Sequence, residues 1–153
     1  MQKIARILID QAHSQAWAVK SEIAATMNPA NPADSSYAKM AQIAKVSEFD
    51  VELHESGLFT ADALAAADIL VIPHASTDEW EKTIGVGSPK FTHEELEVLE
   101  GFVRMGGSLL LLAETEQPKY GNNFAELAAK FGVEVKNSTV QDPSRSYKDV
   151  PTW

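Results

Sequence analysis

Residues 106–115 read Gly-Gly-Ser-Leu-Leu-Leu-Leu-Ala-Glu-Thr, and the architecture follows from this stretch. Its four consecutive leucines lack the alternation of a half-exposed strand, and they are typical of a strand that is buried on both faces in the middle of a parallel sheet. A strongly amphipathic helical pattern precedes it, so helix, glycine turn and strand form half of an α/β unit. Open α/β sheets bind ligands beyond the carboxyl ends of their strands, which here means near Glu114 and Thr115.

The composition is that of one acidic domain. The 153 residues are 44% hydrophobic, which is enough for a core without cross-links. The 22 acidic and 13 basic residues give a formal net charge of -9, and no basic patch is present, so we expect no nucleic-acid partner. The absence of cysteine excludes disulfides, thiolate metal sites and a cysteine nucleophile. With no apolar run near the ~20 residues of a membrane span and no signal-peptide pattern, we predict a cytoplasmic protein without membrane insertion.

The pattern along the chain predicts five strands separated by helices. The strands are expected at 4–9, 49–54, 68–73, in the leucine stretch, and from Val133 to Val135 with a continuation towards Val140; the helices at 14–27, 36–44, 61–67, 92–103 and 123–131. Crossovers of this length favour a flavodoxin-like three-layer sandwich, with a mostly parallel five-stranded sheet and helices on both faces. Residues 1–142 are then one α/β domain and 143–153 a polar tail or linker that leads to further domains. The long irregular stretch 74–91 is a candidate lid.

Polar side chains follow the predicted strands where each strand ends. Carboxylates and histidines recur among them, which is compatible with an acid/base or metal cluster. Strand ends are also polar simply because the chain leaves the core there, and this simpler interpretation stays open. The residues are Asp10, His13, His54, Glu55, His74, Ser76, Glu114, Thr115 and Asp142. Short motifs add nothing, since the chain has neither a Gly-x-Ser-x-Gly elbow nor a zinc-binding helix with two histidines.

Four segments carry a likeness to a known family: 10–13 (Asp-Gln-Ala-His), 67–73, 91–111 and 120–133. Together they resemble the class I glutamine amidotransferase-like superfamily, and within it the ThuA-like domains and the domain shared by gliding-motility transport proteins and an intraflagellar transport protein. True amidotransferases have a cysteine nucleophile after the central strand, followed later by a histidine and a glutamate. This chain has Glu114-Thr115-Glu116 at that turn, no cysteine and no later His-x-Glu pair, so glutaminase chemistry is excluded.

The resemblance and the residues together predict a non-catalytic ligand-binding or protein-interaction domain, without a cofactor or a bound metal. Its partner would be a small molecule, such as a carbohydrate, or a protein. Two alternatives stay open: a hydrolase or carbohydrate-modifying enzyme that uses the His/Asp/Glu cluster, and a structural homodimer that pairs through the sheet edge or the 28–36 segment. The predicted ligand-binding residues are Asp10, His13, His74, Ser76, Glu114 and Asn122.

Overall fold

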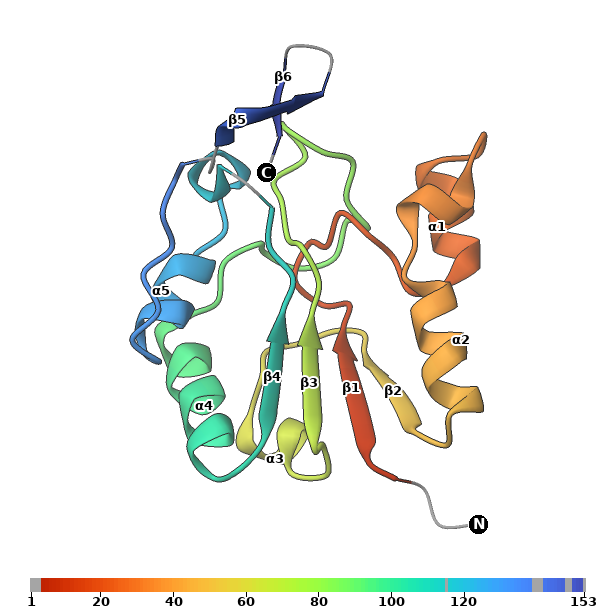
Figure 1. Ribbon diagram of the computed structural model, residues 1–153. Helices are drawn as coiled ribbons and strands as arrows, with labels where there is room; N and C mark the ends of the chain where they lie inside the picture. Colours follow the sequence, from red (N-terminus) through yellow and green to blue (C-terminus); the bar gives the residue numbers. More distant parts are fainter. Residues whose placement is uncertain (1–3, 115, 139–141, 148–149, 153) are drawn as a thin grey trace.

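Four parallel strands form the sheet in a computed structural model of the chain, which describes residues 4–114, 116–138, 142–147 and 150–152. The order across the sheet is β2-β1-β3-β4 (Figure 1). The strands are β1 (Arg6–Asp10), β2 (Asp50–His54), β3 (Ile69–Ile72) and β4 (Ser108–Leu111). All three pairings are parallel, so the prediction of an α/β protein with a parallel sheet is confirmed.

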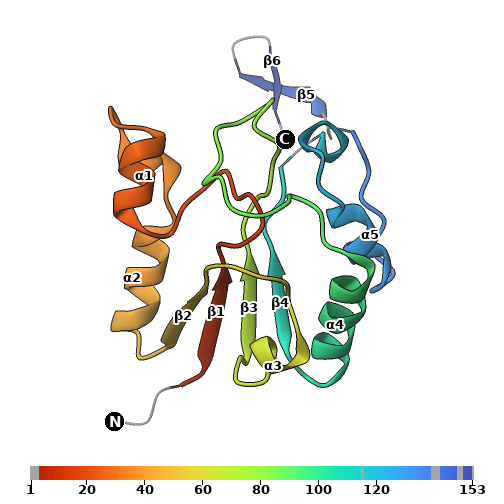
Figure 2. The same cartoon turned by 180° about the vertical axis from the view of Figure 1, so that it is seen from behind.

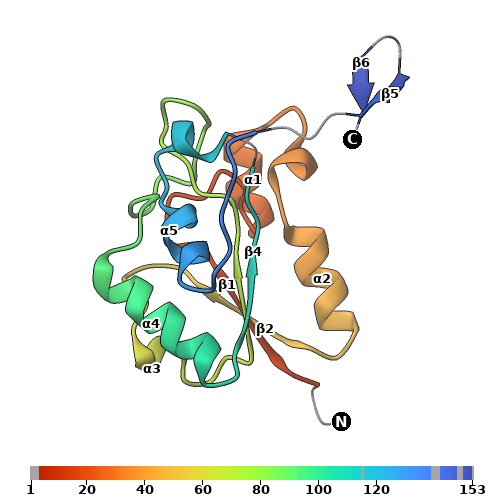
Figure 3. The same cartoon turned by 60° about the vertical axis from the view of Figure 1, so that its left-hand side comes forward.

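Helices cover both faces of the sheet, which makes three layers (Figures 2 and 3). One face carries α3 (Ala61–Leu64), α4 (His93–Arg104) and α5 (Phe124–Ala129); the other carries α1 (Ser21–Met27) and α2 (Ala38–Val46). Short 3-10 turns lie at Pro32–Ser35 and Gln117–Tyr120. The predicted helix at 92–103 begins with a capping box, in which the Thr92 side chain accepts from the Glu95 amide and the Glu95 side chain accepts from the Thr92 amide.

The core lies on both sides of β3. Leu70 and Ile72 point towards α3, α4 and α5, where they join the buried cluster of Leu64, Leu99, Phe102, Phe124 and Leu127. Val71 points the other way and packs with Ile9, Val19 and Ala41 beneath α2. Because β3 has a strand on each side and helices over each face, its unbroken Ile-Leu-Val-Ile sequence is buried in both directions.

The leucine strand β4 lies at the edge of the sheet, so its predicted position in the middle is wrong. Leu109 and Leu111 pack against the α4–α5 cluster, whereas Leu110 points to the other face and is 46% exposed. The helices of that second face pack over β1 and β2 and leave the outer part of the sheet open (Figure 1). Four leucines in succession are therefore compatible with an edge strand that is covered on one face only.

The predicted fifth strand does not form within the described residues. Residues 133–138 are irregular, and residues 139–141 lie outside the described ranges. Instead, β5 (Asp142–Tyr147) and β6 (Val150–Thr152) form a separate antiparallel pair in the part of the chain predicted to be a polar tail. Within the described ranges, no helix has both the length and the apolar character that crossing a membrane requires.

The predicted helix from residue 14 begins only at Ser21. The segment before it is irregular because its amides bond to distant parts of the chain: Ser14 N donates to Val86 O, Ala16 N to His74 O, and Ala18 N to Ser35 O. Ser14 also has a left-handed backbone, with φ of 49°. Residues 11–20 thus cross the carboxyl ends of the strands as a mostly buried polar segment, which shapes the candidate site.

Candidate functional site

His13 is held between two carboxylates at the end of β1. Its Nδ1 lies 3.0 and 2.9 Å from the two carboxylate oxygens of Asp10, and its Nε2 lies 2.8 Å from Glu95 Oε1. The ring stacks on Phe59 and meets the edge of Phe91, each with centroids 4.9 Å apart. Since carboxylates only accept, both ring nitrogens donate and the imidazole is a cation. Burial lowers the pKa of His13, but the hydrogen bonds and charges of Asp10 and Glu95 outweigh it and leave that pKa raised.

Glu95 completes this cluster and was not among the predicted site residues. Its carboxylate is 1% exposed and accepts from Phe59 N at 2.8 Å and Thr92 N at 2.9 Å, in addition to His13. Burial alone would raise the pKa of Glu95, yet these two amides and His13 lower it overall. The sequence shows Glu95 as a helix cap, whereas its contact with His13 spans 82 residues and has no local signal.

His74, at the end of β3, meets one carboxylate only. Its Nε2 lies 2.9 Å from Glu81 Oε2, and its Nδ1 has no hydrogen-bond partner within the described part of the chain. The ring meets the face of Tyr120 edge-on at 4.5 Å. Burial lowers the pKa of His74, and the opposing charges of Glu81 and Glu114 do not reverse this, so the imidazole is neutral at pH 7.

Glu114, at the end of β4, is exposed and lies near His74, as expected for the ends of adjacent strands. The same charges act on Tyr37: burial raises the pKa of its hydroxyl, and the negative charges of Glu114 and Glu81 raise it further. Of these residues, His74 and Glu81 are in direct contact, and the charge of Glu114 acts on both His74 and Tyr37.

The remaining predicted residues, Ser76 and Asn122, hold the chain in place. Ser76 is buried; its hydroxyl donates to Thr77 O at 3.0 Å, and its carbonyl accepts from Ser14 Oγ at 2.8 Å. Asn122 Nδ2 donates to Ala75 O at 2.8 Å and thereby ties the turn after β4 to the turn after β3. Both side chains act on backbone groups, which is the usual role of Ser and Asn at strand ends.

Two cavities at this end of the sheet divide the predicted residues. One, of about 210 Å³, is lined by Glu114, Gln117 and Asn122 together with parts of 123–126 and 135–137. The other, of about 370 Å³, borders His13 beside Gly87 and the following loop. Asp10, His74 and Ser76 line neither cavity. The six predicted residues therefore do not form one pocket.

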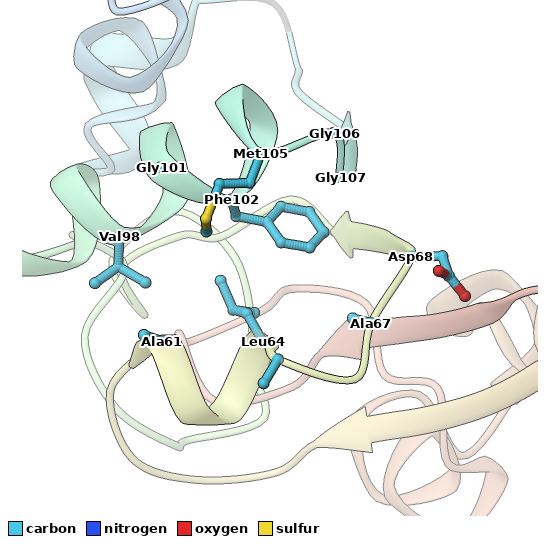
Figure 4. A pocket seen from close by; sticks show the side chains of 11 residues that line it. Ala61, Leu64, Ala67, Asp68, Val98, Gly101, Phe102, Met105, Gly106 and Gly107 are labelled. Atoms are coloured by element: carbon cyan, nitrogen blue, oxygen red, sulfur yellow. The ribbon is translucent and has the colours of Figure 1, made fainter.

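A larger cavity of about 530 Å³ lies at the opposite end of the sheet, between α3 and α4 (Figure 4). Leu64, Val98, Phe102 and Met105 project into it, and Asp68 stands at one side. Its lining is apolar and close to the amino ends of β3 and β4. Ligands of open α/β sheets bind at the other end, so this cavity is not the candidate site.

The 74–91 segment, a candidate lid, is irregular, as predicted, and is tied down along its length. Thr83 Oγ1 donates to Asp78 at 2.6 Å, and Ile84 N donates to Gln15 O at 3.0 Å. Among the residues with described positions, no group of three or more His, Cys, Asp or Glu side chains is placed to hold a metal ion.

Comparison with known proteins gives no relative: no family model, no curated protein and no solved structure matches the chain.

Proposed function

We propose that the chain is a non-catalytic binding domain of flavodoxin-like, amidotransferase-like fold that takes a small polar ligand at the carboxyl ends of β3 and β4. The parallel order β2-β1-β3-β4 supports this, because it is the order of the first four strands of a flavodoxin-like sheet. The ligand site would be the cavity of about 210 Å³ lined by Glu114, Gln117 and Asn122.

One observation carries the proposal: the side-chain oxygen of Gln117 is buried and has no hydrogen-bond partner within the described part of the chain. Gln117 lines this cavity and is only 4% exposed. A buried acceptor without a partner costs about 1–3 kcal/mol, which a ligand hydroxyl or amino group would recover. Three glutamates and three asparagines line the same cavity together with Lys136, so most of its polar lining can accept hydrogen bonds and it suits a ligand with several donors, such as a carbohydrate.

The geometry of His13 supports the non-catalytic part of the proposal. A general base needs a free ring nitrogen within reach of a substrate. Both nitrogens of His13 are taken by Asp10 and Glu95, and its side chain is 3% exposed. The hydrolase alternative therefore loses one of the two histidines in its cluster, and the Asp10–His13–Glu95 group is better suited to holding β1, α4 and the Phe59 turn together.

The test is a titration followed by amide NMR with glucose, inositol and glucosamine. We expect shift changes in the segments 114–117 and 122–126, and weaker binding in Gln117→Leu. Gln42→Leu, the same change at an exposed position on α2, is the control and should bind as the unmodified protein does. Changes confined to the α3–α4 cavity, or full binding by Gln117→Leu, would contradict the assignment of the site.

A second candidate function, self-association, is favoured by the open edge of β4. Ser108 N donates to Asp68 O, just before β3, and Leu112 N donates to Ile72 O at its end. The alternation of a parallel ladder therefore directs the backbone groups of Leu109 and Leu111 outwards. An antiparallel pairing of two copies about a two-fold axis at Leu110 would satisfy all of these groups and cover its exposed side chain. Light scattering should then show a dimer that Leu110→Lys dissociates, whereas a monomer at all concentrations contradicts this function.

A further inference from the structure

We infer that the cavity of about 530 Å³ between α3 and α4 binds an uncharged aromatic molecule of one or two rings. It is a second site, at the opposite end of the sheet from the polar cavity, and it is independent of the proposed function. Its volume lies within the range of about 300–1,000 Å³ that is usual for small-molecule pockets, which are lined mainly by apolar side chains. An apolar cavity of about 150 Å³ already holds benzene, so this one has room for two fused rings.

Helix α4 carries a second apolar stripe beside the one that is buried in the core. Its residues follow the i, i+3, i+4, i+7 spacing of one helix face and line the cavity: Val98, Gly101, Phe102 and Met105. The helix opposite, α3, is a single turn and is too short to cover this stripe, so that Met105 is 83% exposed. Since a surface helix normally has polar residues on a face without a partner, an uncovered apolar stripe indicates that something packs there.

Gly101 leaves the middle of this stripe open. A Cβ atom at Gly101 would meet no heavy atom within 4 Å, so no close contact requires a glycine at this position. Glycine is also among the least favourable residues in a helix interior. The side chains on either side of it along the stripe, Val98 and Met105, project into the cavity (Figure 4). At Gly107, in contrast, a Cβ atom would overlap the Phe102 ring, so this second glycine gives the ring its place in the cavity wall.

The charges around the cavity favour an uncharged ligand. Among the described residues that line it, Asp68 is the only charged one, and its Oδ2 accepts from Arg6 N at 2.8 Å. This negative charge, on a chain with a net charge of -9, repels carboxylates and phosphates. Asp68 stands to one side of the apolar side chains (Figure 4). A cation among those side chains would therefore lose its water without gaining an acceptor.

The side chains that project into the cavity suit an aromatic ring. The Phe102 ring can meet another ring in a stacked or edge-to-face arrangement. The Met105 thioether contacts aromatic rings favourably, and its flexible chain adapts to their shape. Leu64 and Val98 supply the remaining apolar surface. A ligand that covers the exposed Met105 side chain would also remove apolar area from water, which favours binding.

The experiment compares indole, indole-3-acetate and tryptamine, which share one ring system and are neutral, anionic and cationic at pH 7. Each is titrated into the full chain, and binding is followed through the methyl NMR signals of Leu64, Val98 and Met105. We expect indole to shift these signals and to bind at least tenfold more tightly than the two charged compounds. No shift of these methyl groups at about 10 mM indole would overturn the site, and equal binding of indole-3-acetate would overturn its preference for an uncharged ligand.

Two variants test the position of the ligand. Gly101→Leu fills the middle of the cavity and should abolish the shifts that indole causes. Met105→Glu changes an exposed side chain, so it tests the site independently of any effect on folding, and it should weaken indole at least tenfold. Glu94→Leu adds a leucine at an exposed position of the same helix outside the cavity, and this matched control should bind indole as the unmodified protein does. Unchanged binding in Met105→Glu would overturn the assignment.

Two further measurements separate a free molecule from other occupants of the cavity. N-acetyltryptophanamide carries the same ring system on a peptide-like backbone. Tighter binding of this compound than of indole would assign the cavity to a side chain of a partner protein and overturn the inference. Light scattering together with the methyl signals tests a second copy of the chain. A dimer whose formation shifts the signals of Val98 and Met105 would likewise replace the small molecule.

Discussion

Replacement of Glu95 by alanine should remove a large part of the stability of the fold. The carboxylate is 1% exposed and accepts from His13 Nε2, Phe59 N and Thr92 N at 2.8, 2.8 and 2.9 Å. Removing one partner of a buried ion pair costs about 3–5 kcal/mol, and each amide left without an acceptor about 1–3 kcal/mol. The three losses are not additive because the side chain would leave room for water, so we expect about 4 kcal/mol out of a total of about 5–15 kcal/mol.

Urea unfolding followed by far-UV circular dichroism measures this loss. Glu94→Ala is the matched control, since Glu94 is the preceding residue of the same helix turn and is exposed, so it should lose at most about 1 kcal/mol of helix-dipole stabilisation. Glu95→Gln should fall between the two. Its amide keeps one oxygen for His13 and Phe59 but turns a donor towards Thr92 N, which leaves one amide unsatisfied.

The refuting result is a loss below about 1 kcal/mol in Glu95→Ala, similar to that of the control. It would mean that His13 is not held as a buried cation between two carboxylates. The reading of His13 as a residue that stabilises the scaffold would then fail, and the histidine would again be available for catalysis.

Three further predictions concern titration, backbone and packing. In imidazole NMR, His13 should stay protonated above the ordinary pKa of 6.5, and His74 should stay neutral below it. The stability that His13 contributes is then complete below pH 6.5 and is lost as the pH rises through its raised pKa. The stability that depends on neutral His74 is present above pH 6.5 and is lost as the pH falls through its lowered pKa. Gly87→Ala should lower the free energy of unfolding in urea clearly more than Gly85→Ala does. Both glycines have positive φ, which costs a residue with a side chain about 1–2 kcal/mol, but only at Gly87 does the added carbon overlap a backbone carbonyl, that of Ala12. Leu110→Ala should lower the free energy of unfolding of the monomer by less than about 1.5 kcal/mol, because the side chain is 46% exposed; a fully buried leucine would lose about 2–5 kcal/mol. A larger loss would place β4 inside a sheet rather than at its edge.

Features set by neighbouring residues could be predicted from the sequence. The capping box of Thr92 and Glu95 marks the start of α4, and the Thr60 side chain accepts from Ala63 N at the start of α3. The run at 69–72 is buried on both faces, as its composition indicates. In each case the signal depends on hydrogen bonds or periodicities within about one turn of chain, which a single sequence contains.

Features set by distant contacts could not be predicted. The leucines of β4 have the composition of a central strand, but burial of the second face depends on a neighbouring strand and a covering helix that the composition does not specify. Residues 14–20 have a helical period, yet bonds from Ser14 and Ala16 to the 74–91 segment keep them irregular. The spacing of Thr92 and Glu95 marks a helix start, but nothing local marks Glu95 as the partner of His13, because that pairing exists only once α4 packs beside β1.

The two buried histidines at the carboxyl ends of β1 and β3 differ in how their burial is compensated. His13 and His74 follow neighbouring strands and are both almost fully buried, so burial alone would lower the pKa of each. His13 is compensated by two aligned carboxylates and becomes a fixed cation, with no hydrogen-bonding capacity left for a ligand. His74 has a single carboxylate, that of Glu81 at 2.9 Å, and burial still leaves its pKa lowered. A buried group that is fully satisfied stabilises the fold, and one that is left unsatisfied is where an additional molecule gains most on binding. Of the two cavities at this end of the sheet, the one that holds the unpaired oxygen of Gln117 is therefore better suited to a ligand than the one beside the fully paired His13.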